Sequence, residues 1–133
     1  MNIQDGSLAQ DLLWADPSLD YPGFVRNKLR EVSYTFGADQ VHKLCKALKL
    51  NMIVRGHQVM PNGYGFFANR CLVTVFSAPM YDLSMKNKAA VMNISSKCRI
   101  SFTLINPVDL KENGGEENFQ KKFIDDETGY HPT

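Results

Sequence analysis

Residues 51–81 constrain the fold of this chain more than any other stretch. They contain three short apolar runs bounded by Gly, Pro and Asn, a pattern that predicts strands. The predicted strands are residues 52–54, 64–68 and 72–76. The first run ends at Arg55-Gly56, and His57 follows it directly. The pattern therefore predicts a small sheet with a titratable ring where one strand ends, which is a common way to position a functional residue.

A single helix is predicted before this sheet. It is expected to begin at Gly37 and to end near residue 48, with Asp39 favourable in its first turn. A short β-rich segment, residues 32–36, precedes it. His42 lies off the apolar stripe of the helix and is predicted to be solvated. The stripe itself recurs at i, i+3, i+4 and i+7 and consists of Val41, Leu44, Cys45 and Leu48.

An antiparallel hairpin is predicted after the sheet. Its strands are residues 89–94 and 99–105, and residues 95–97 form the turn. Apolar residues of the second strand alternate with polar ones, so one face is expected to be buried: Ile100, Phe102 and Leu104. Strand, helix, strand and antiparallel meander together predict an α/β chain that amounts to half of a sandwich.

The two ends of the chain carry weaker signals. Pro17 and Pro22-Gly23 interrupt any helix in the first thirty residues, which predicts an ordered loop pinned by Trp14. Residues 108–133 hold mixed charges and few apolar side chains, which predicts a polar, disordered tail. Residues 1–107 would then form the folded part.

Composition narrows the class of function. The 133 residues carry a formal net charge of +1, so no overall field favours nucleic acid or a membrane as partner. No apolar run approaches the length of a membrane span. The cysteines are odd in number and lie apart in apolar runs, which predicts reduced, buried thiols in a cytoplasmic or nuclear protein. They are Cys45, Cys71 and Cys98.

Several segments resemble motifs of one enzyme family. They are residues 11–17 (DLLWADP), 30–37 (REVSYTFG), 55–58 (RGHQ), 63–70 (GYGFFANR) and 72–81 (LVTVFSAPMY). In this order and at about this spacing they resemble the metallophosphoesterase-type serine/threonine protein phosphatases, closest to the type-1 branch. The resemblance continues to about Pro107 and covers only the C-terminal part of that family's catalytic domain. It implies the C-terminal portion of an αββα sandwich, incomplete in this chain.

His57 is the first candidate site residue. Taken alone, a histidine in a turn is more often hydrogen-bonded than metal-bound, although a neutral imidazole is a good ligand for Zn, Fe or Mn. The resemblance implies that His57 is a metal ligand, because the histidine of the family's Arg-x-His-Gln motif binds one of two catalytic divalent metals. Those metals activate the water that attacks the phosphoester in line.

Arg30 and Tyr81 are the other two candidates for catalysis. A guanidinium can hold a phosphate through two parallel hydrogen bonds, and the resemblance implies that Arg30 grips the substrate phosphate. The family has glycine where Glu31 follows, so this carboxylate is expected either to pair with Arg30 or to repel phosphate. The resemblance places Tyr81 in a loop over the active site. The residues around it differ from the family's Asn-Tyr-Cys-Gly, which predicts altered inhibitor sensitivity.

Five further residues concern partners. They resemble the positions that line an apolar groove in type-1 phosphatases, where an Arg-Val-x-Phe-type peptide of a regulatory subunit lies beside a sheet edge. Apolar core positions would look the same in the sequence, so both interpretations stay open. The five residues are Met52, Phe66, Cys98, Ile100 and Phe102.

The family's main metal-binding motifs do not occur in this chain. Gly-Asp-x-His, Gly-Asp-x-Val-Asp-Arg-Gly and Gly-Asn-His-Glu are all absent, and one histidine alone binds metals weakly. The resemblance therefore implies a metal-dependent phosphatase of phosphoserine and phosphothreonine proteins, with this chain inactive on its own. The alternative is a non-catalytic, phosphatase-like binding module that keeps the peptide-docking groove.

Overall fold

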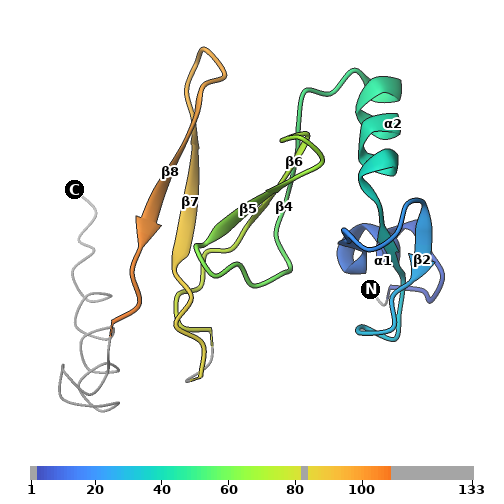
Figure 1. The fold of residues 1–133 in the computed structure, drawn as a ribbon, viewed down its shortest axis with the longest axis horizontal. Coiled ribbons are helices and arrows are strands. Elements are labelled where there is room, and N and C mark those ends of the chain that lie inside the picture. Colours follow the sequence, from blue (N-terminus) through green and yellow to red (C-terminus); the bar gives the residue numbers. More distant parts are fainter. Residues whose placement is uncertain (1–2, 82–83, 109–133) are drawn as a thin grey trace, which may run out of the picture.

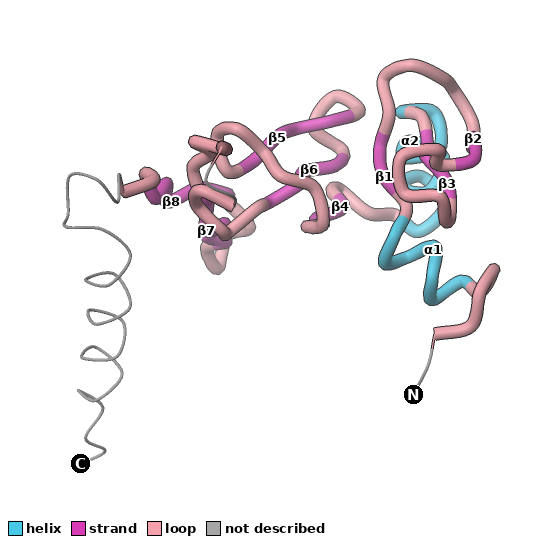
Figure 2. Tube along the Cα trace, turned by 90° about the horizontal axis from the view of Figure 1, so that it is seen from below, coloured by secondary structure: helices cyan, strands magenta, loops and turns pink. Residues whose placement is uncertain are grey.

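The computed structural model describes residues 3–81 and 84–108. In these two ranges the chain forms two helices and three small sheets, which follow one another along the longest axis (Figure 1). A second view shows the sheets spread along that axis rather than stacked as layers (Figure 2). The arrangement is a small mixed α/β one, in agreement with the predicted class.

The N-terminal segment differs from the predicted ordered loop, because it contains a helix. Helix α1 (Leu8–Trp14) begins at Ser7, whose hydroxyl accepts a hydrogen bond from the Gln10 N–H at 3.2 Å. This Ser-x-x-Gln spacing is a helix-capping signal that the prediction overlooked. The helix ends at Ala15, because Asp16 precedes a proline and such residues favour extended backbone.

Short strands follow α1 and form the first sheet. Strand β1 (Asp16–Pro17) pairs in parallel with β3 (Tyr34–Phe36), and β2 (Phe24–Arg26) pairs antiparallel with the other edge of β3. Strand β3 begins later than the predicted residue 32, because Ser33 has a positive φ of 59° and cannot continue a strand.

Helix α2 (Ala38–Leu48) confirms the predicted helix. Gly37 is its N-cap, and Lys49 ends it in a left-handed conformation with φ of 54°. Asp39 in the first turn accepts the Gly23 N–H at 2.9 Å, which ties the helix to the first sheet. That hydrogen bond is the main reason why the pKa of Asp39 is lowered.

The second sheet confirms the three strands predicted for residues 51–81 to within one residue at each end. Its strands are β4 (Ile53–Arg55), β5 (Tyr64–Phe67) and β6 (Leu72–Val75). The order is β4-β6-β5, with β4 parallel and β5 antiparallel to the central β6.

The core lies between α2 and the second sheet. Its buried members are Val41, Cys45, Ala68 and Leu72, with Phe36, Ile53 and Phe67 packed against them. The stripe predicted for α2 is only half buried, because Leu44 and Leu48 are 47% and 59% exposed. No described element covers these two leucines. His42 is exposed, as predicted, and its Nε2 lies 3.1 Å from the Ala68 carbonyl oxygen.

The third sheet is the predicted hairpin, β7 (Ala89–Ile94) with β8 (Ile100–Ile105). It joins the second sheet near the start of β7, where the Ala90 N–H donates to the Phe76 carbonyl at 2.9 Å. The predicted buried face of β8 is wrong, because Ile100 and Leu104 are 38% and 45% exposed.

Cys98 corrects the prediction of three buried thiols. It lies in the hairpin turn with φ of 55° and is exposed, whereas Cys45 is buried and Cys71 is half-buried. In the described residues no helix is long and apolar enough to span a membrane. Apart from Val108, the predicted tail of residues 108–133 lies outside the described ranges.

Candidate functional site

Asp16 lies at the centre of a buried polar cluster between the first and second sheets. Only 3% of this residue is exposed. Its Oδ1 accepts a hydrogen bond from Arg55 Nη2 at 2.8 Å. Its Oδ2 accepts from Arg30 Nε and from Asn27 Nδ2, each at 3.1 Å. We call these four residues the Asp16 cluster. A buried carboxylate is tolerated here because two cations and an amide satisfy both of its oxygens.

Arg55 connects the cluster to the rest of the fold. It ends β4, and its Nη1 donates to Gln58 Oε1 at 2.7 Å and to Thr74 Oγ1 at 3.3 Å. Its Nη2 also donates to the Ala15 carbonyl oxygen at 3.1 Å. Burial lowers the pKa of Arg55, and the neighbouring Asp16 opposes that shift. Arg55 is thus fully engaged in holding the two sheets together.

Asn27 sets the backbone of the turn that carries Arg30. The Asn27 side chain is buried, and its Oδ1 accepts the N–H groups of Leu29 and Arg30, each at 3.1 Å. An asparagine that binds the backbone two and three residues later stabilises a turn locally. The turn therefore presents Arg30 to the Asp16 carboxylate in a defined orientation.

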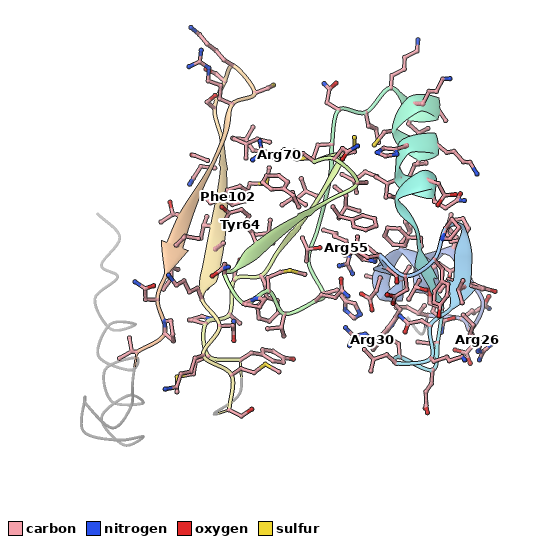
Figure 3. All side chains as sticks on the ribbon, viewed as in Figure 1. Arg26, Arg30, Arg55, Tyr64, Arg70 and Phe102 are labelled. Atoms are coloured by element: carbon pink, nitrogen blue, oxygen red, sulfur yellow. The ribbon has the colours of Figure 1, made fainter. Side chains whose placement is uncertain are left out.

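Arg30, the predicted phosphate clamp, has only one of its three guanidinium nitrogens engaged by other described residues. Its Nε pairs with Asp16, and its side chain is 28% exposed. Among the described residues no hydrogen-bond partner is found for its two terminal nitrogens. A bound phosphate would accept hydrogen bonds from these two nitrogens. Figure 3 shows Arg30 at the end of the first sheet, with Arg55 approaching from the second.

Glu31 is not an ion-pair partner of Arg30 in the described part of the chain. Its side chain is exposed, and its carbonyl oxygen accepts from Arg26 Nη2 at 3.3 Å. The backbone of Glu31 has φ of 61°, in the left-handed region where glycine is unstrained. This backbone conformation therefore explains why the phosphatases that the chain resembles have glycine at this position.

His57, the predicted metal ligand, lies in the turn after β4 with φ of 74°. Its ring meets the Trp14 ring edge to face, with centroids 5.1 Å apart. Partial desolvation lowers the pKa of His57, and the nearby cation of Arg30 lowers it further. Asp16 opposes this shift and Arg55 adds to it. Since the neutral imidazole is the form that binds metals, desolvation and the two arginines favour the ligand form.

Tyr81 contacts Phe76 and Asn87 in the described part of the chain, and no contact with the Asp16 cluster is found there. Its ring packs edge to face on Phe76, with centroids 5.2 Å apart, and its N–H donates to Asn87 Oδ1 at 3.0 Å. The side chain is 62% exposed. Residues 82–83 lie outside the described ranges, so the predicted loop is described only as far as Tyr81 itself.

The predicted groove residues come together in part. Phe66 and Phe102 meet edge to face at 6.0 Å, and Tyr64 stacks on Phe102 at 3.9 Å between centroids (Figure 3 labels Tyr64 and Phe102). Ile100 is two residues before Phe102 and so lies on the same face of β8. Cys98 lies beyond the strand, in the turn, and Met52 precedes β4 on the far side of the sheet order from β5.

Three residues of this region were missed as site residues by sequence reasoning: Asp16, Asn27 and Arg55. Each lies in or beside a quoted motif, but only the fold reveals that they meet. A usable signal was the carboxylate of Asp16 two residues after an apolar turn that ends in Trp14, because a charge next to apolar side chains needs a partner.

The described residues do not fit a complete two-metal centre. No group of three or more His, Cys, Asp and Glu side chains in the described ranges is arranged to hold a metal ion. Asp16, the carboxylate whose charge raises the pKa of His57, has both oxygens engaged by arginines and Asn27. His57 is the one predicted ligand that this part of the chain provides.

Comparison with known proteins agrees with the resemblance at the level of the serine/threonine protein phosphatases and does not show the type-1 branch. No protein-family model matches the chain. A serine/threonine-protein phosphatase of Caenorhabditis elegans is 44% identical over 108 residues, which cover 81% of this chain and 23% of the relative. A solved protein serine/threonine phosphatase of Saccharomyces cerevisiae, described as similar to human phosphatase PP5, matches with a TM-score of 0.62 and 28% identity.

The structural match covers 74% of this chain and 33% of the yeast chain. The chain thus spans about a quarter of the worm relative and a third of the yeast structure. Its mixed α/β fold corresponds to part of a phosphatase structure. Over this part of its length, the protein is homologous to the serine/threonine protein phosphatases.

Proposed function

We propose that this chain forms the phosphate-binding, C-terminal part of a metal-dependent serine/threonine protein phosphatase catalytic domain. The complete domain would be an αββα sandwich of the metallophosphoesterase type, and its substrates would be phosphoserine and phosphothreonine proteins. The observation that carries the proposal is Arg30, which a buried carboxylate orients while its terminal nitrogens stay available. The homology over 108 residues supports it.

Each predicted residue has a role in this proposal. Arg30 would donate both terminal nitrogens to oxygens of the phosphoryl group. His57 would hold one metal, since its neighbours favour the neutral ring. Tyr81, exposed on its loop, would contact the substrate beside the phosphate. The Asp16 carboxylate positions Arg30 and Arg55 and would not itself touch the substrate.

The 133-residue chain alone is proposed to bind phosphate esters without hydrolysing them. Divalent metals supply the activated water in this chemistry, and the described residues do not complete a site for two of them. The assignment to the type-1 branch depends on the particular residues of the sequence motifs. A cytoplasmic or nuclear location depends on the three unpaired cysteines.

Binding and turnover measurements test this function together. We expect a fluorescent phosphoserine peptide to bind the chain more tightly than its unphosphorylated form, and Arg30→Gln to remove that difference. Lys46→Gln on the exposed face of α2 is the matched control, since it removes a cation outside the site. Equal binding of both peptides to the wild-type chain would contradict the phosphate site.

Elemental analysis tests the metal proposal separately. We expect fewer than two Mn, Fe or Zn ions per purified chain, and a lower content in His57→Ala. Manganese-dependent hydrolysis of a phosphate ester that His57→Ala abolishes would show that the chain is an enzyme by itself.

A second candidate function is favoured by the aromatic contacts between the second and third sheets. A non-catalytic module would use Phe66, Phe102 and their neighbours to bind an Arg-Val-x-Phe-type peptide of a regulatory subunit, and Phe66 is 37% exposed. Titration of such a peptide would then show binding that Phe102→Ala weakens and Arg30→Gln leaves unchanged.

A further inference from the structure

We propose that a hollow beside the Asp16 cluster binds an acidic residue that flanks the phosphorylated residue of the substrate, an inference that rests on the proposed function. The chain would then prefer phosphopeptides with Asp or Glu next to the phosphoresidue. The residues that carry this selectivity are Arg26 and Lys28, neither of which takes part in the proposed phosphate clamp.

The hollow is adjacent to the proposed phosphate site. It has a volume of about 480 Å³, and its lining includes Asp16, Tyr21, Arg26, Asn27, Lys28 and Gln58. Asp16 and Asn27 belong to the Asp16 cluster, and Gln58 accepts a hydrogen bond from Arg55. Successive residues of an extended peptide are about 3.3–3.6 Å apart. A residue one or two positions from a phosphoresidue on Arg30 would therefore reach this lining.

Two cations, Arg26 and Lys28, and two carboxylates, Asp16 and Asp20, line the hollow. Arg26 and Lys28 are exposed, and neither forms an ion pair with another described residue. The charge of Asp16 is compensated by Arg30 and Arg55. The other lining carboxylate is Asp20, which accepts a hydrogen bond from the Ser18 hydroxyl at 3.2 Å. A further carboxylate from a peptide would thus meet two cations that have no ion pair among the described residues.

Arg26 is also held in place. It ends β2, and its Nη2 donates to the Glu31 carbonyl oxygen at 3.3 Å. Figure 3 shows Arg26 and Arg30 at the same end of the first sheet. A guanidinium that is already anchored loses less side-chain entropy when it binds a carboxylate, which favours selectivity at this position.

Fluorescence anisotropy with three peptides tests the inference on the 133-residue chain. The peptides carry phosphoserine with neutral flanks, phosphoserine with Asp and Glu flanks, and unphosphorylated serine with the same acidic flanks. We expect the acidic flanks to tighten phosphopeptide binding about tenfold, because an exposed ion pair contributes a factor of about 1.4 to 5 and two cations act together. The difference is expected to shrink as salt is raised.

Charge reversal assigns the effect to residues. Arg26→Glu with Lys28→Glu is expected to abolish the flank preference and to leave the Arg30-dependent phosphate preference in place. Lys97→Glu with Arg99→Glu changes net charge equally at the hairpin turn, far from β2 (Figure 1), and is expected to keep the preference. If the charge-reversed variant loses its far-ultraviolet circular dichroism, the double variant Arg26→Gln with Lys28→Gln is measured instead, because it removes the two charges without adding negative ones.

The outcomes separate this inference from the proposed function. Phosphopeptide binding that ignores the flanks, or an equal loss in the hairpin control, overturns the inference and leaves the phosphate site standing. If phosphate makes no difference but the acidic peptide binds through Arg26 and Lys28, the proposed function fails and the acidic site stands. No binding of any acidic peptide overturns the inference.

Discussion

The Asp16 cluster and the β7–β8 hairpin are organised in opposite ways. The cluster joins residues up to 39 positions apart through side-chain hydrogen bonds, and Asp16 is 3% exposed. The hairpin pairs residues close in sequence through a regular backbone ladder, yet many of its side chains remain exposed. Tertiary contacts between distant segments therefore hold the site together, whereas the hairpin depends mainly on local backbone pairing and contacts the second sheet near the start of β7.

The comparison indicates where mutations should matter. Asp16 and Asn27 are buried in the cluster, so removal of the Asp16 carboxylate leaves buried donors unpaired. Apolar side chains such as Ile94 and Leu104 on the hairpin already contact water, so their truncation costs little. Burial and connectivity, more than residue type, should determine the size of each effect.

The largest effect is expected for Asp16→Ala. It leaves Arg30, Arg55 and Asn27 without their shared acceptor, and breaking a buried ion pair costs about 3–5 kcal/mol. Urea unfolding followed by fluorescence of Trp14, the single tryptophan, measures the change. Asp20→Ala, on an exposed carboxylate, is the control. Equal midpoints for the two variants would show that the cluster does not support the fold.

Leu72→Ala is expected to cost about 2–5 kcal/mol, because Leu72 is 1% exposed in the core between α2 and the second sheet. Leu104→Ala on β8 makes the same chemical change at a residue that is 45% exposed and should cost less than about 1 kcal/mol. The same urea experiment compares them. A similar loss at both positions would mean that another surface covers the hairpin.

A smaller, stabilising effect is expected for Glu31→Gly. The left-handed conformation of Glu31 costs about 1 kcal/mol for a residue with a Cβ, and glycine removes this strain from the folded state. Part of the gain is lost again, because glycine also gives the unfolded chain more conformational entropy. The net gain should be about 0.5 kcal/mol or a little more. Lys46→Gly, inside α2, should instead lose about 1 kcal/mol. Destabilisation by Glu31→Gly would indicate that the glutamate side chain contributes contacts of its own.

The most local effect is expected on the titration of His57. Its pKa lies below the ordinary value of about 6.5, and Arg30→Gln should move it upward because this change removes the cation that, after desolvation, lowers the pKa most. Titration of the imidazole by proton NMR measures the pKa of His57 in the wild-type chain and in Arg30→Gln. Since the folded state disfavours the cation, this contribution to stability is complete above pH 6.5 and is lost as pH falls through the folded pKa. Lys43→Gln, on α2, should leave the titration unchanged.

Much of the fold could be predicted from local patterns. Residues 51–81 have short apolar runs and turn residues, and the structure has strands there to within one residue. Helix α2 followed from its apolar spacing. Helix α1 was missed because the interrupting prolines were given more weight than the capping signal at Ser7.

Burial was less predictable than secondary structure. The apolar spacing of α2 selected four residues, but only Val41 and Cys45 are buried. Leu44 and Leu48 share the same pattern and stay exposed because no described element packs on them. Periodicity identifies a face that can be buried, and the neighbouring elements decide how much of it is.

The sequence by itself determined helix α2, the strands of the second sheet and the hairpin. It also determined the chemical types present: an arginine before a β-rich run, a histidine after a strand, and apolar residues in alternation. These follow from side-chain sterics and hydrogen bonding within a few residues. The tertiary structure alone decided that Asp16 meets Arg30 and Arg55 and that Trp14 meets His57. The reason is that a buried carboxylate is stable only where separate segments deliver donors to it, and such a meeting leaves no local periodic signal.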